Sequence, residues 1–424
     1  MAVILRSNTD LVYLPDHGFV GEEGALRILP QITRQIHRLD ISHNLLGSAG
    51  TLTLFKGLST LRLRHSSPEL GLGIWGLKEI NLGMNGLDDI ALDCVLGYAK
   101  KDVYLKRVLV QGNEIKLDLK FVESIINSLN SSKINSLSLV NNTSIDQDGL
   151  NRFLDLLNST ELKQLNLSAC NLDHKITDSI MKYLSSSRSR NLENLELNGN
   201  HLGSESITKI IDSIEESNFT ITSIGLLANH ALSDQLVAID DDQPQQNDNG
   251  YNDPRLIDRT EENRSMEYQV HRRLPELLNR NKILTKRIKQ ATLKALVPCR
   301  IILNGLEPSN EYTAKRIINE ISNGIFDHNK FRLMDLPEEV IHLILKHTSE
   351  DYLAFSDSQW LKLRKESINK ENLMNMYNRR LNRLRGKGIL YTKQERMEVE
   401  NELRDGFLKR GKWDKWEMNG ASSI

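Results

Sequence analysis

One spacing of apolar residues recurs seven times along the first half of the chain. It reads apolar, two residues, apolar, one residue, apolar, two residues, Asn or Cys, one residue, apolar. The copies begin at Ile36, Leu77, Leu105, Ile134, Leu162, Leu192 and Ile221, at intervals of 41, 28, 29, 28, 30 and 29 residues. A fixed period of this length is typical of stacked repeats, in which each unit buries its apolar face only against its neighbours.

Each position of the spacing has a physical reading. The central apolar–x–apolar step alternates sides, which predicts a short strand with one buried face. The Asn, replaced by Cys170 in the fifth copy, can satisfy backbone groups where the chain leaves the strand. Apolar residues at three- and four-residue spacing then predict helices between the strands, over 121–129, 149–158, 176–185 and 206–216. The predicted fold class is therefore α/β, with strands and helices alternating.

The seven copies resemble leucine-rich repeats of the ribonuclease-inhibitor-like class. The resemblance covers residues 36–232 and implies a right-handed horseshoe with strands inside and helices outside. We expect residues 1–35 to form an N-terminal cap, with a short strand in LVYL and a helix in GEEGALRILPQI. The long first interval contains RLRHSSPELGLG, which we interpret as an inserted loop.

Charge divides the chain into blocks. The net charge is −10 over residues 1–254, +7 over 255–300, −5 over 301–360 and +7 over 361–424. Residues 233–254 are polar and acidic, which predicts a flexible linker. We expect 255–306 to form a helical C-terminal cap of the repeats, similar to the flank of uncharacterised fungal proteins with such repeats. Residues 307–424 should form a further, mainly helical region. The basic blocks could dock on the acidic first half or on an outside partner.

The stretch FRLMDLPEEVIHLILKHTS resembles the opening of an F-box, within residues 333–365. The residues that carry this resemblance are Leu336, Pro337, Val340, Ile344 and Leu345. It implies binding to the linker subunit of a cullin ubiquitin ligase. Pro at the first turn also starts ordinary helices, so the alternative is an amphipathic helix of the chain's own core.

Composition limits the other classes of partner. Lys and Arg number 55 against 56 Asp and Glu, and aromatics are only 5%, so we expect no nucleic acid. The arginine-rich stretch NMYNRRLNRLRGKGIL is interpreted as a solvated helix face. The tryptophans Trp413 and Trp416 are interpreted as core residues.

The N-terminal apolar run is too short for a signal peptide, and no stretch reaches about 18 apolar residues. Three cysteines make no disulfide framework. We therefore expect no membrane partner and a place in the cytoplasm or nucleus.

The sequence contains no motif that indicates an enzyme. Phosphate-binding and dinucleotide-binding glycine motifs are absent, as are CxxC and HExxH, so we predict no catalytic residue, no metal and no cofactor. The residues 41–55 do resemble the first-repeat turn of Ran-type GTPase-activating proteins. In that family an Arg follows on the helix, where this chain has Leu52, and Arg34 or Arg38 would be the nearest substitutes.

The function predicted from the sequence is a non-catalytic scaffold or adaptor that binds proteins through its repeats. One alternative is an F-box-type substrate receptor. A further alternative is a GTPase-activating protein of the Ran type. Side chains that flank the two core positions of each strand should face the partner. The candidate contact residues are Arg38, Asp40, Glu79, Asn81, Arg107, Gln111, Gln164, Asn166, Asn194 and Glu196. None of the corresponding positions on the seven strands is aromatic, so we expect a small, polar inner face.

Overall fold

The computed structural model describes residues 10–66, 75–229, 268–306, 336–369 and 393–417. The chain divides into two compact units, Met1–Asn279 and Arg280–Ile424. The linker expected over 233–254 and the arginine-rich stretch 375–390 lie outside the described residues. The domain ranges expected from the sequence stay predictions.

The first unit contains an eight-stranded parallel sheet whose strands follow one another in chain order. The strands are β1 (Leu11–Tyr13), β2 (Arg38–Asp40), β3 (Glu79–Asn81), β4 (Arg107–Leu109), β5 (Ser136–Ser138), β6 (Gln164–Asn166), β7 (Asn194–Glu196) and β8 (Ser223–Gly225). Each has three residues, and the middle one is buried while its neighbours are more exposed, as in Val12 of β1 and Leu165 of β6. The period of two therefore directs one side chain per strand into the core.

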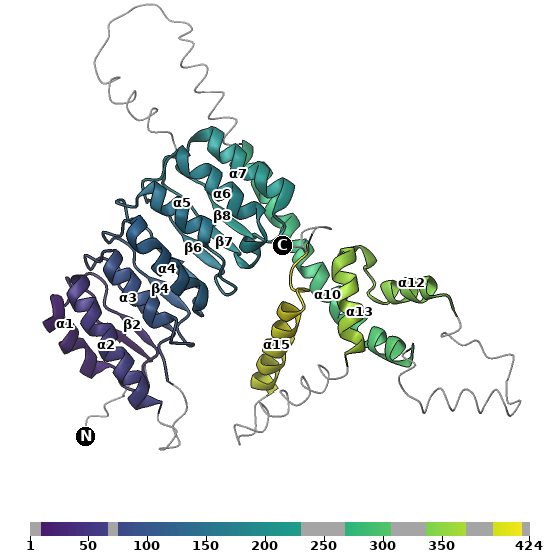
Figure 1. Ribbon diagram of the computed structural model, residues 1–424, viewed down its shortest axis with the longest axis horizontal. Helices are drawn as coiled ribbons and strands as arrows, with labels where there is room; N and C mark the ends of the chain where they lie inside the picture. The colour runs from purple at the N-terminus through teal and green to yellow at the C-terminus, as the bar shows by residue number, and fades with distance from the viewer. Residues whose placement is uncertain (1–9, 67–74, 230–267, 307–335, 370–392, 418–424) are drawn as a thin grey trace, which may run out of the picture. The chain divides into compact units, whose positions relative to one another are not determined.

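Helices alternate with these strands and form one layer against the sheet (Figure 1). They are α1 (Gly21–Ile28), α2 (Gly47–His65), α3 (Asp89–Ala99), α4 (Leu119–Ser131), α5 (Gln147–Leu156), α6 (Thr177–Ser185) and α7 (Gly203–Ser217). On α4 the buried residues Val122, Ile125, Ile126 and Leu129 recur at helical spacing. The predicted alternation of parallel strands and helices is confirmed, and it is compatible with a leucine-rich repeat horseshoe.

Aspartates begin several of these helices. The side chains of Asp88, Asp118 and Asp146 accept hydrogen bonds from backbone N–H groups in the first turns of α3, α4 and α5. These N–H groups have no partner within the helix, so the carboxylates satisfy them and complement the helix dipole. The change from strand to helix is therefore fixed at a defined residue in these three repeats.

Two expectations about the start of the chain can be compared with the structure. Strand β1 and helix α1 lie in the segments expected for the N-terminal cap. The inserted loop expected in RLRHSSPELGLG is wrong in part, because α2 runs through His65 and its 19 residues include Arg62 to His65. Apolar and cationic side chains with good helix propensity extend the helix there.

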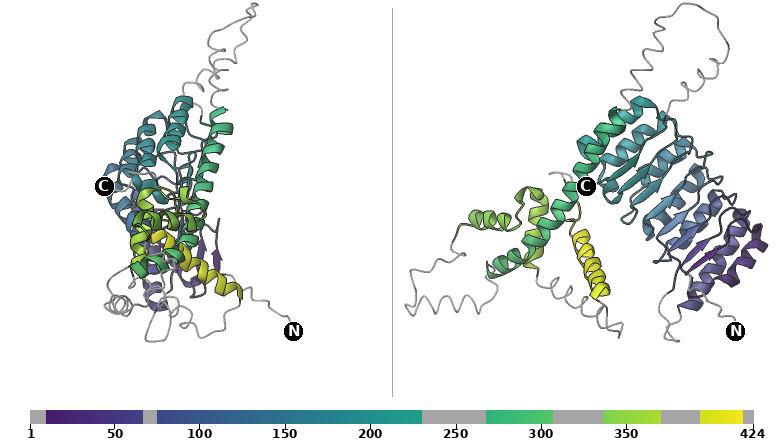
Figure 2. Two further views of the ribbon diagram at one scale, coloured as in Figure 1. Left: turned by 90° about the vertical axis from the view of Figure 1, so that its right-hand side faces the viewer. Right: turned by 180° about the vertical axis from the view of Figure 1, so that it is seen from behind.

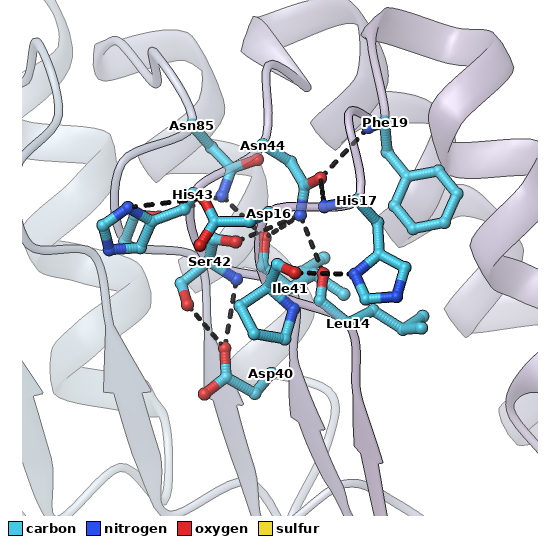
Figure 3. A network of polar contacts seen from close by, with 12 residues as sticks. Leu14, Asp16, His17, Phe19, Asp40, Ile41, Ser42, His43, Asn44 and Asn85 are labelled. Carbon is cyan, nitrogen blue, oxygen red and sulfur yellow. Dashed lines mark hydrogen bonds and ion pairs between the residues drawn. The ribbon is translucent and has the colours of Figure 1, made fainter.

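Buried asparagines join each turn to the one before it. The Nδ2 group of Asn44 donates to the carbonyl oxygens of Leu14 and Ile41, at 3.0 and 2.9 Å. Its Oδ1 accepts from the backbone N–H groups of His17 and Phe19, at 3.1 and 3.0 Å (Figure 3). One amide thus satisfies four backbone groups where strands end and no ladder partner exists. Related contacts recur at Asn85, Asn113, Asn142, Asn200 and Asn229.

In the fifth copy of the spacing, Cys170 occupies the position of the buried Asn and forms weaker hydrogen bonds. Its Sγ lies 3.1 Å from the carbonyl oxygen of Leu139, and its own N–H donates to Oδ1 of Asn200 at 2.9 Å. The residue is fully buried, and this burial raises the pKa of the thiol to about 11. The sulfur therefore stays protonated at neutral pH and acts as a weak donor.

A long helix, α10 (Leu274–Leu306), begins in the first unit and continues in the second (Figure 2). A π-helical turn, Gln269–Arg273, precedes it. Leu274 and Leu277 belong to the hydrophobic cluster of the first unit. Arg273 forms ion pairs with Asp212, at 2.7 Å, and with Glu215, both on α7. Within the basic block 255–300, Arg273 thus pairs with acidic residues of α7. Residues 255–267 lie outside the described residues.

The second unit has its own core. Helices α12 (Glu338–Thr348), α13 (Asp357–Ile368) and α15 (Lys393–Arg410) accompany the rest of α10. Trp360, Leu363 and Trp413 are buried in its hydrophobic cluster. The Nε2 group of Gln359 donates to the carbonyl oxygens of Lys412 and Lys415, at 3.0 and 2.7 Å. These bonds join the start of α13 to the segment after α15. Across the described ranges of both units, no helix combines the length and the apolar character needed to span a bilayer.

Candidate functional site

The candidate contact residues lie on the side of the sheet opposite the helices, which we call the strand face. The strand face consists of the first and third residue of each strand and the residues two positions after it. The strand registers arrange it in rows. One row contains Arg38, Glu79, Arg107, Ser136, Gln164 and Asn194, and the next contains Asp40, Asn81, Leu109, Ser138, Asn166 and Glu196. Parallel, in-register pairing therefore brings together residues that are 28 to 41 positions apart in the sequence.

Charges alternate at the N-terminal end of the first row. Arg38 forms an ion pair with Asp10 at 2.7 Å, and Arg107 forms one with Glu79. The hydrogen bond from Arg38 lowers the pKa of the Asp10 carboxyl, and the Asp10 carboxylate raises the pKa of Arg38. The Arg38–Asp10 pair is partly solvated and contributes little to stability, whereas in the second pair Arg107 is exposed and Glu79 is mostly buried. Their effect is to hold the side chains in a fixed pattern of positive and negative charge.

A chain of hydrogen bonds crosses the second row. Asp40 accepts from the Nδ2 group of Asn81 at 3.0 Å, and Asn81 accepts in turn from the Nε2 group of Gln111 at 3.0 Å. Ser42 donates from Oγ to the other oxygen of Asp40 at 2.7 Å (Figure 3). Gly83 leaves the space that Gln111 occupies, since a Cβ there would lie 2.5 Å from its Nε2. The polar atoms of this region are thus positioned before any partner arrives.

The C-terminal end of the strand face is polar and carries fewer charges. Glu196 accepts from the Nδ2 group of Asn198 at 2.8 Å, and Asn166 accepts from the N–H of Ser168 at 3.0 Å. The Glu196 carboxylate lies over Gly225, where a Cβ would come within 2.0 Å of its Oε2. Among the described residues, Oδ1 of Asn194 has no hydrogen-bond partner although solvent does not reach it.

The structure adds one aromatic residue that the sequence-based list lacks. Tyr13, the third residue of β1, is in register with Asp40 and 64% exposed. The seven-copy spacing begins only at Ile36 and so leaves β1 out. The alternation in LVYL, with Val12 buried between two neighbours, was the signal that places Tyr13 on the strand face. Tyr combines contact area with a polar group at small entropic cost, so it is a strong candidate contact.

The F-box-like residues lie on α12 and directly before it, and their side chains differ in exposure. Pro337 is the N-cap residue and is exposed, and Val340 is 38% exposed. Leu336 and Ile344 are half-buried, whereas Leu345 is fully buried in the core of the second unit. Residues 333–335 lie outside the described residues. The set therefore divides between an outer face and the unit's own core.

Leu52 and Arg38, which were considered for GTPase activation, lie on α2 and β2. Leu52, at the position where a Ran-type protein has its Arg, is 44% exposed on α2. Arg38 is held in its ion pair with Asp10. Within the described ranges, no three His, Cys, Asp or Glu side chains are grouped so that they could hold a metal ion.

A scan of the sequence against protein-family models finds no match. A search of curated proteins finds no match either.

Proposed function

We propose that the chain is a leucine-rich repeat protein of the ribonuclease-inhibitor-like class and serves as a non-catalytic scaffold or adaptor. The observation that carries the proposal is the strand face. Eight parallel strands in chain order present rows of polar side chains on one surface. A surface built from many repeats suits an extended protein partner, because each strand adds contacts next to those of its neighbours.

The chemistry of the strand face indicates how it would bind. The alternating charges of Asp10, Arg38, Glu79 and Arg107 favour a partner with the complementary pattern and accelerate the encounter. Because Asp40, Asn81 and Gln111 are already hydrogen-bonded to one another, binding costs them little further ordering. Tyr13 is a suitable anchor beside this network. We therefore expect a polar, hydrated interface centred on β1 to β4.

The test is affinity capture with mass spectrometry on three forms of the full chain. The strand-face variant is Glu79→Arg/Asn81→Arg, which adds bulk and positive charge on β3, within the expected interface. The matched control is Asn127→Arg/Glu216→Arg, which makes the same replacements at exposed positions of α4 and α7. Partners captured by wild type and control but lost by the strand-face variant support the proposal. Identical partner sets for both variants would contradict it.

A second function is favoured by one observation in the second unit. Pro337, Val340 and Leu343 form an outer apolar surface at the start of α12, and Leu343 is 56% exposed. The resemblance to an F-box implies that this surface binds the linker subunit of a cullin ubiquitin ligase. The repeats would then bind the substrate, and the chain would be a substrate receptor.

This second function is tested by Val340→Arg. The matched control is Leu361→Arg, which places the same charge on an exposed leucine of α13. Capture of the linker subunit by wild type and control, with loss in Val340→Arg, would support the receptor function. If wild type captures no linker subunit, the receptor function is wrong and the scaffold proposal stands on its own test.

A further inference from the structure

Helix α2 differs from the other helices of the first unit in charge. It carries Lys56, Arg62 and Arg64 and no acidic residue, whereas each of α1 and α3 to α7 contains at least one Asp or Glu. Its outer side also exposes leucines, with Leu52 at 44% and Leu63 at 74%. A helix that only covers a core would place polar residues there, so this surface is suited to a further contact.

A groove of about 700 Å³ lies between α2 and α3, which are neighbours in the helix layer (Figure 1). Leu52 and Phe55 line it from α2, and Gly97 lines it from α3. A Cβ built on Gly97 meets no atom within 4 Å, so the groove is open at that point. Its volume lies within the range of about 300–1,000 Å³ that is usual for binding pockets.

The wall of the groove is held in place by aromatic and polar contacts. The rings of Phe55 and Tyr98 meet edge to face at 5.2 Å between centroids. Tyr98 donates to Oδ2 of the buried Asp102 at 2.8 Å, and the Arg62 guanidinium lies over its ring at 5.7 Å. The groove is therefore a fixed feature of the α2–α3 packing, with an apolar floor.

Three lysines and one acidic residue, Glu22 of α1, surround this floor, so the rim has a net positive charge. Lys56, Lys100 and Lys101 all line the groove and are all exposed. Within the described ranges, none of their ammonium groups has an ion-pair partner. The described part of the chain around the groove has the opposite sign, since residues 10–66 and 75–229 contain 21 Lys and Arg against 25 Asp and Glu. The groove is thus a local cationic site on an acidic unit, and an acidic ligand is attracted there and repelled elsewhere.

We propose that the α2–α3 groove binds an acidic amphipathic segment of a partner protein. Leucine-like side chains of the segment contact Leu52, Phe55 and the open space at Gly97. Its carboxylates pair with Lys56, Lys100 and Lys101. This is the mode in which an amphipathic helix places its apolar face in a groove with complementary charge around it. The site is on the helix layer, so the inference is independent of the function proposed for the strand face.

The probe is a fluorescein-labelled 18-residue peptide of Glu with Leu at helical spacing, and its binding to the full chain is followed by anisotropy. Two control peptides replace every Glu by Lys or every Leu by Ser. Lys100→Glu/Lys101→Glu should weaken binding of the acidic peptide by about tenfold or more. Lys116→Glu/Lys120→Glu, which makes the same charge change at exposed positions outside the groove, should bind as wild type does. Gly97→Phe, which fills the open space, should weaken binding while the chain keeps its circular dichroism spectrum.

A second readout is the half-buried Cys94, which also lines the groove. Bound peptide should slow its alkylation, and the Ser-substituted peptide should not. The proposal is overturned if both lysine pairs weaken binding equally, since the attraction is then general. It is also overturned if the Ser-substituted peptide binds as well as the Leu peptide, or if inorganic phosphate displaces the peptide at matched ionic strength. Loss of a self-associated form in Lys100→Glu/Lys101→Glu would assign the groove to a second copy instead.

Discussion

At the scale of single residues, the buried amide of each repeat does more for the fold than any surface charge. Asn113 shows why. Its Oδ1 accepts from the N–H groups of Asn85 and Leu87, at 2.8 and 3.1 Å, and its Nδ2 donates to the carbonyl oxygens of Leu82 and Val110, at 3.1 and 2.9 Å. Each partner is a buried backbone group at the end of a strand. The carbonyl oxygens of Leu82 and Val110 also accept from Asn85 and Asn142, whereas the two N–H groups have Asn113 Oδ1 as their partner. Without the amide these two buried donors would be unpaired.

Asn113→Ala should therefore lower the free energy of unfolding of the first unit by about 3 kcal/mol, because two buried backbone N–H groups lose their partner at once. Urea unfolding followed by circular dichroism measures the change. Asn127→Ala is the control, since Asn127 is exposed on α4 and Ala has the higher helix propensity. An Asn113→Ala midpoint equal to that of the control would show that water replaces the amide.

Some of these single residues could be predicted from the sequence and others could not. The positions of Asn44, Asn85 and Asn113 follow from the spacing alone, because backbone groups at every strand end require a partner. Tyr13 was not among the predicted contacts, because a cap strand has no repeat register to place it. The fixed hydrogen bonds among Asp40, Asn81 and Gln111 also required coordinates, since spacing places residues on a face without saying which atoms meet.

At the scale of elements, helix packing decides where a glycine is necessary and where it is not. Gly97, inside α3, has open space at its Cβ position and no positive φ. Gly149, in the first turn of α5, has the carbonyl oxygen of Leu117 only 1.9 Å from its Cβ position. The first glycine only adds flexibility to the unfolded chain, whereas the second permits a close approach between neighbouring repeats.

Gly97→Ala should raise the free energy of unfolding by about 0.5–1 kcal/mol, because Ala restricts the unfolded chain and fits the helix. Gly149→Ala should lower it by about 1–3 kcal/mol, because the backbone must move to admit the methyl group. Thermal unfolding of the two variants beside wild type measures both changes. If the unfolding temperatures of both variants shift in the same direction, the proposed difference in packing between Gly97 and Gly149 is wrong.

A bidentate ion pair joins α10 to the turn before α13 within the second unit. The Nε and Nη2 groups of Arg287 donate to the two carboxylate oxygens of Asp351, at 2.6 and 2.7 Å. The hydrogen bond from Arg287 lowers the pKa of Asp351. Paired geometry of this kind is more favourable than a single contact, although both side chains are partly solvated and screening reduces the gain.

Asp351→Asn should lower the free energy of unfolding by about 1 kcal/mol near neutral pH. A carboxyl whose folded pKa is lowered stabilises the fold above its unfolded pKa of about 3.9, and this contribution is lost as pH falls through the folded pKa. Wild type and variant should therefore converge in acid. Urea unfolding at neutral and acidic pH measures this. Glu350→Gln, at the more exposed Lys294–Glu350 pair, should have a smaller effect, and a pH-independent difference for Asp351→Asn would contradict the assignment.

The elements of the two units were predictable to different degrees. In the first unit the period repeats, so each helix and strand confirms the register of the next, and strands β2 to β8 lie where the spacing placed them. In the second unit no period exists. The start of α12 follows from Pro337 and the apolar pattern after it, but the burial of Leu345 and Trp413 together depends on α10, α13 and α15, which are distant in sequence. Such contacts leave no local signal.

At the scale of the whole molecule, each compact unit has a hydrophobic cluster of its own. The first cluster runs from Val12 to Leu277, and the second from Ile288 to Trp413. Repeats are stabilised by their neighbours in the stack, whereas the helices of the second unit surround one core. Because α10 is continuous across the division at Asn279, the question is whether this helix makes the two units unfold together.

We predict that they unfold in separate transitions, because each core is complete within its unit. The Trp75→Phe background tests this, since the three remaining tryptophans, Trp360, Trp413 and Trp416, all belong to the second unit and fluorescence then reports on that unit alone. Leu345→Ala should lower its fluorescence midpoint, because truncating a fully buried leucine costs about 2–5 kcal/mol. Asn113→Ala should leave that midpoint unchanged and move only the circular dichroism signal of the repeats. If Asn113→Ala also lowers the fluorescence midpoint, α10 couples the two cores, and unfolding of one unit would then reach any partner bound to the other.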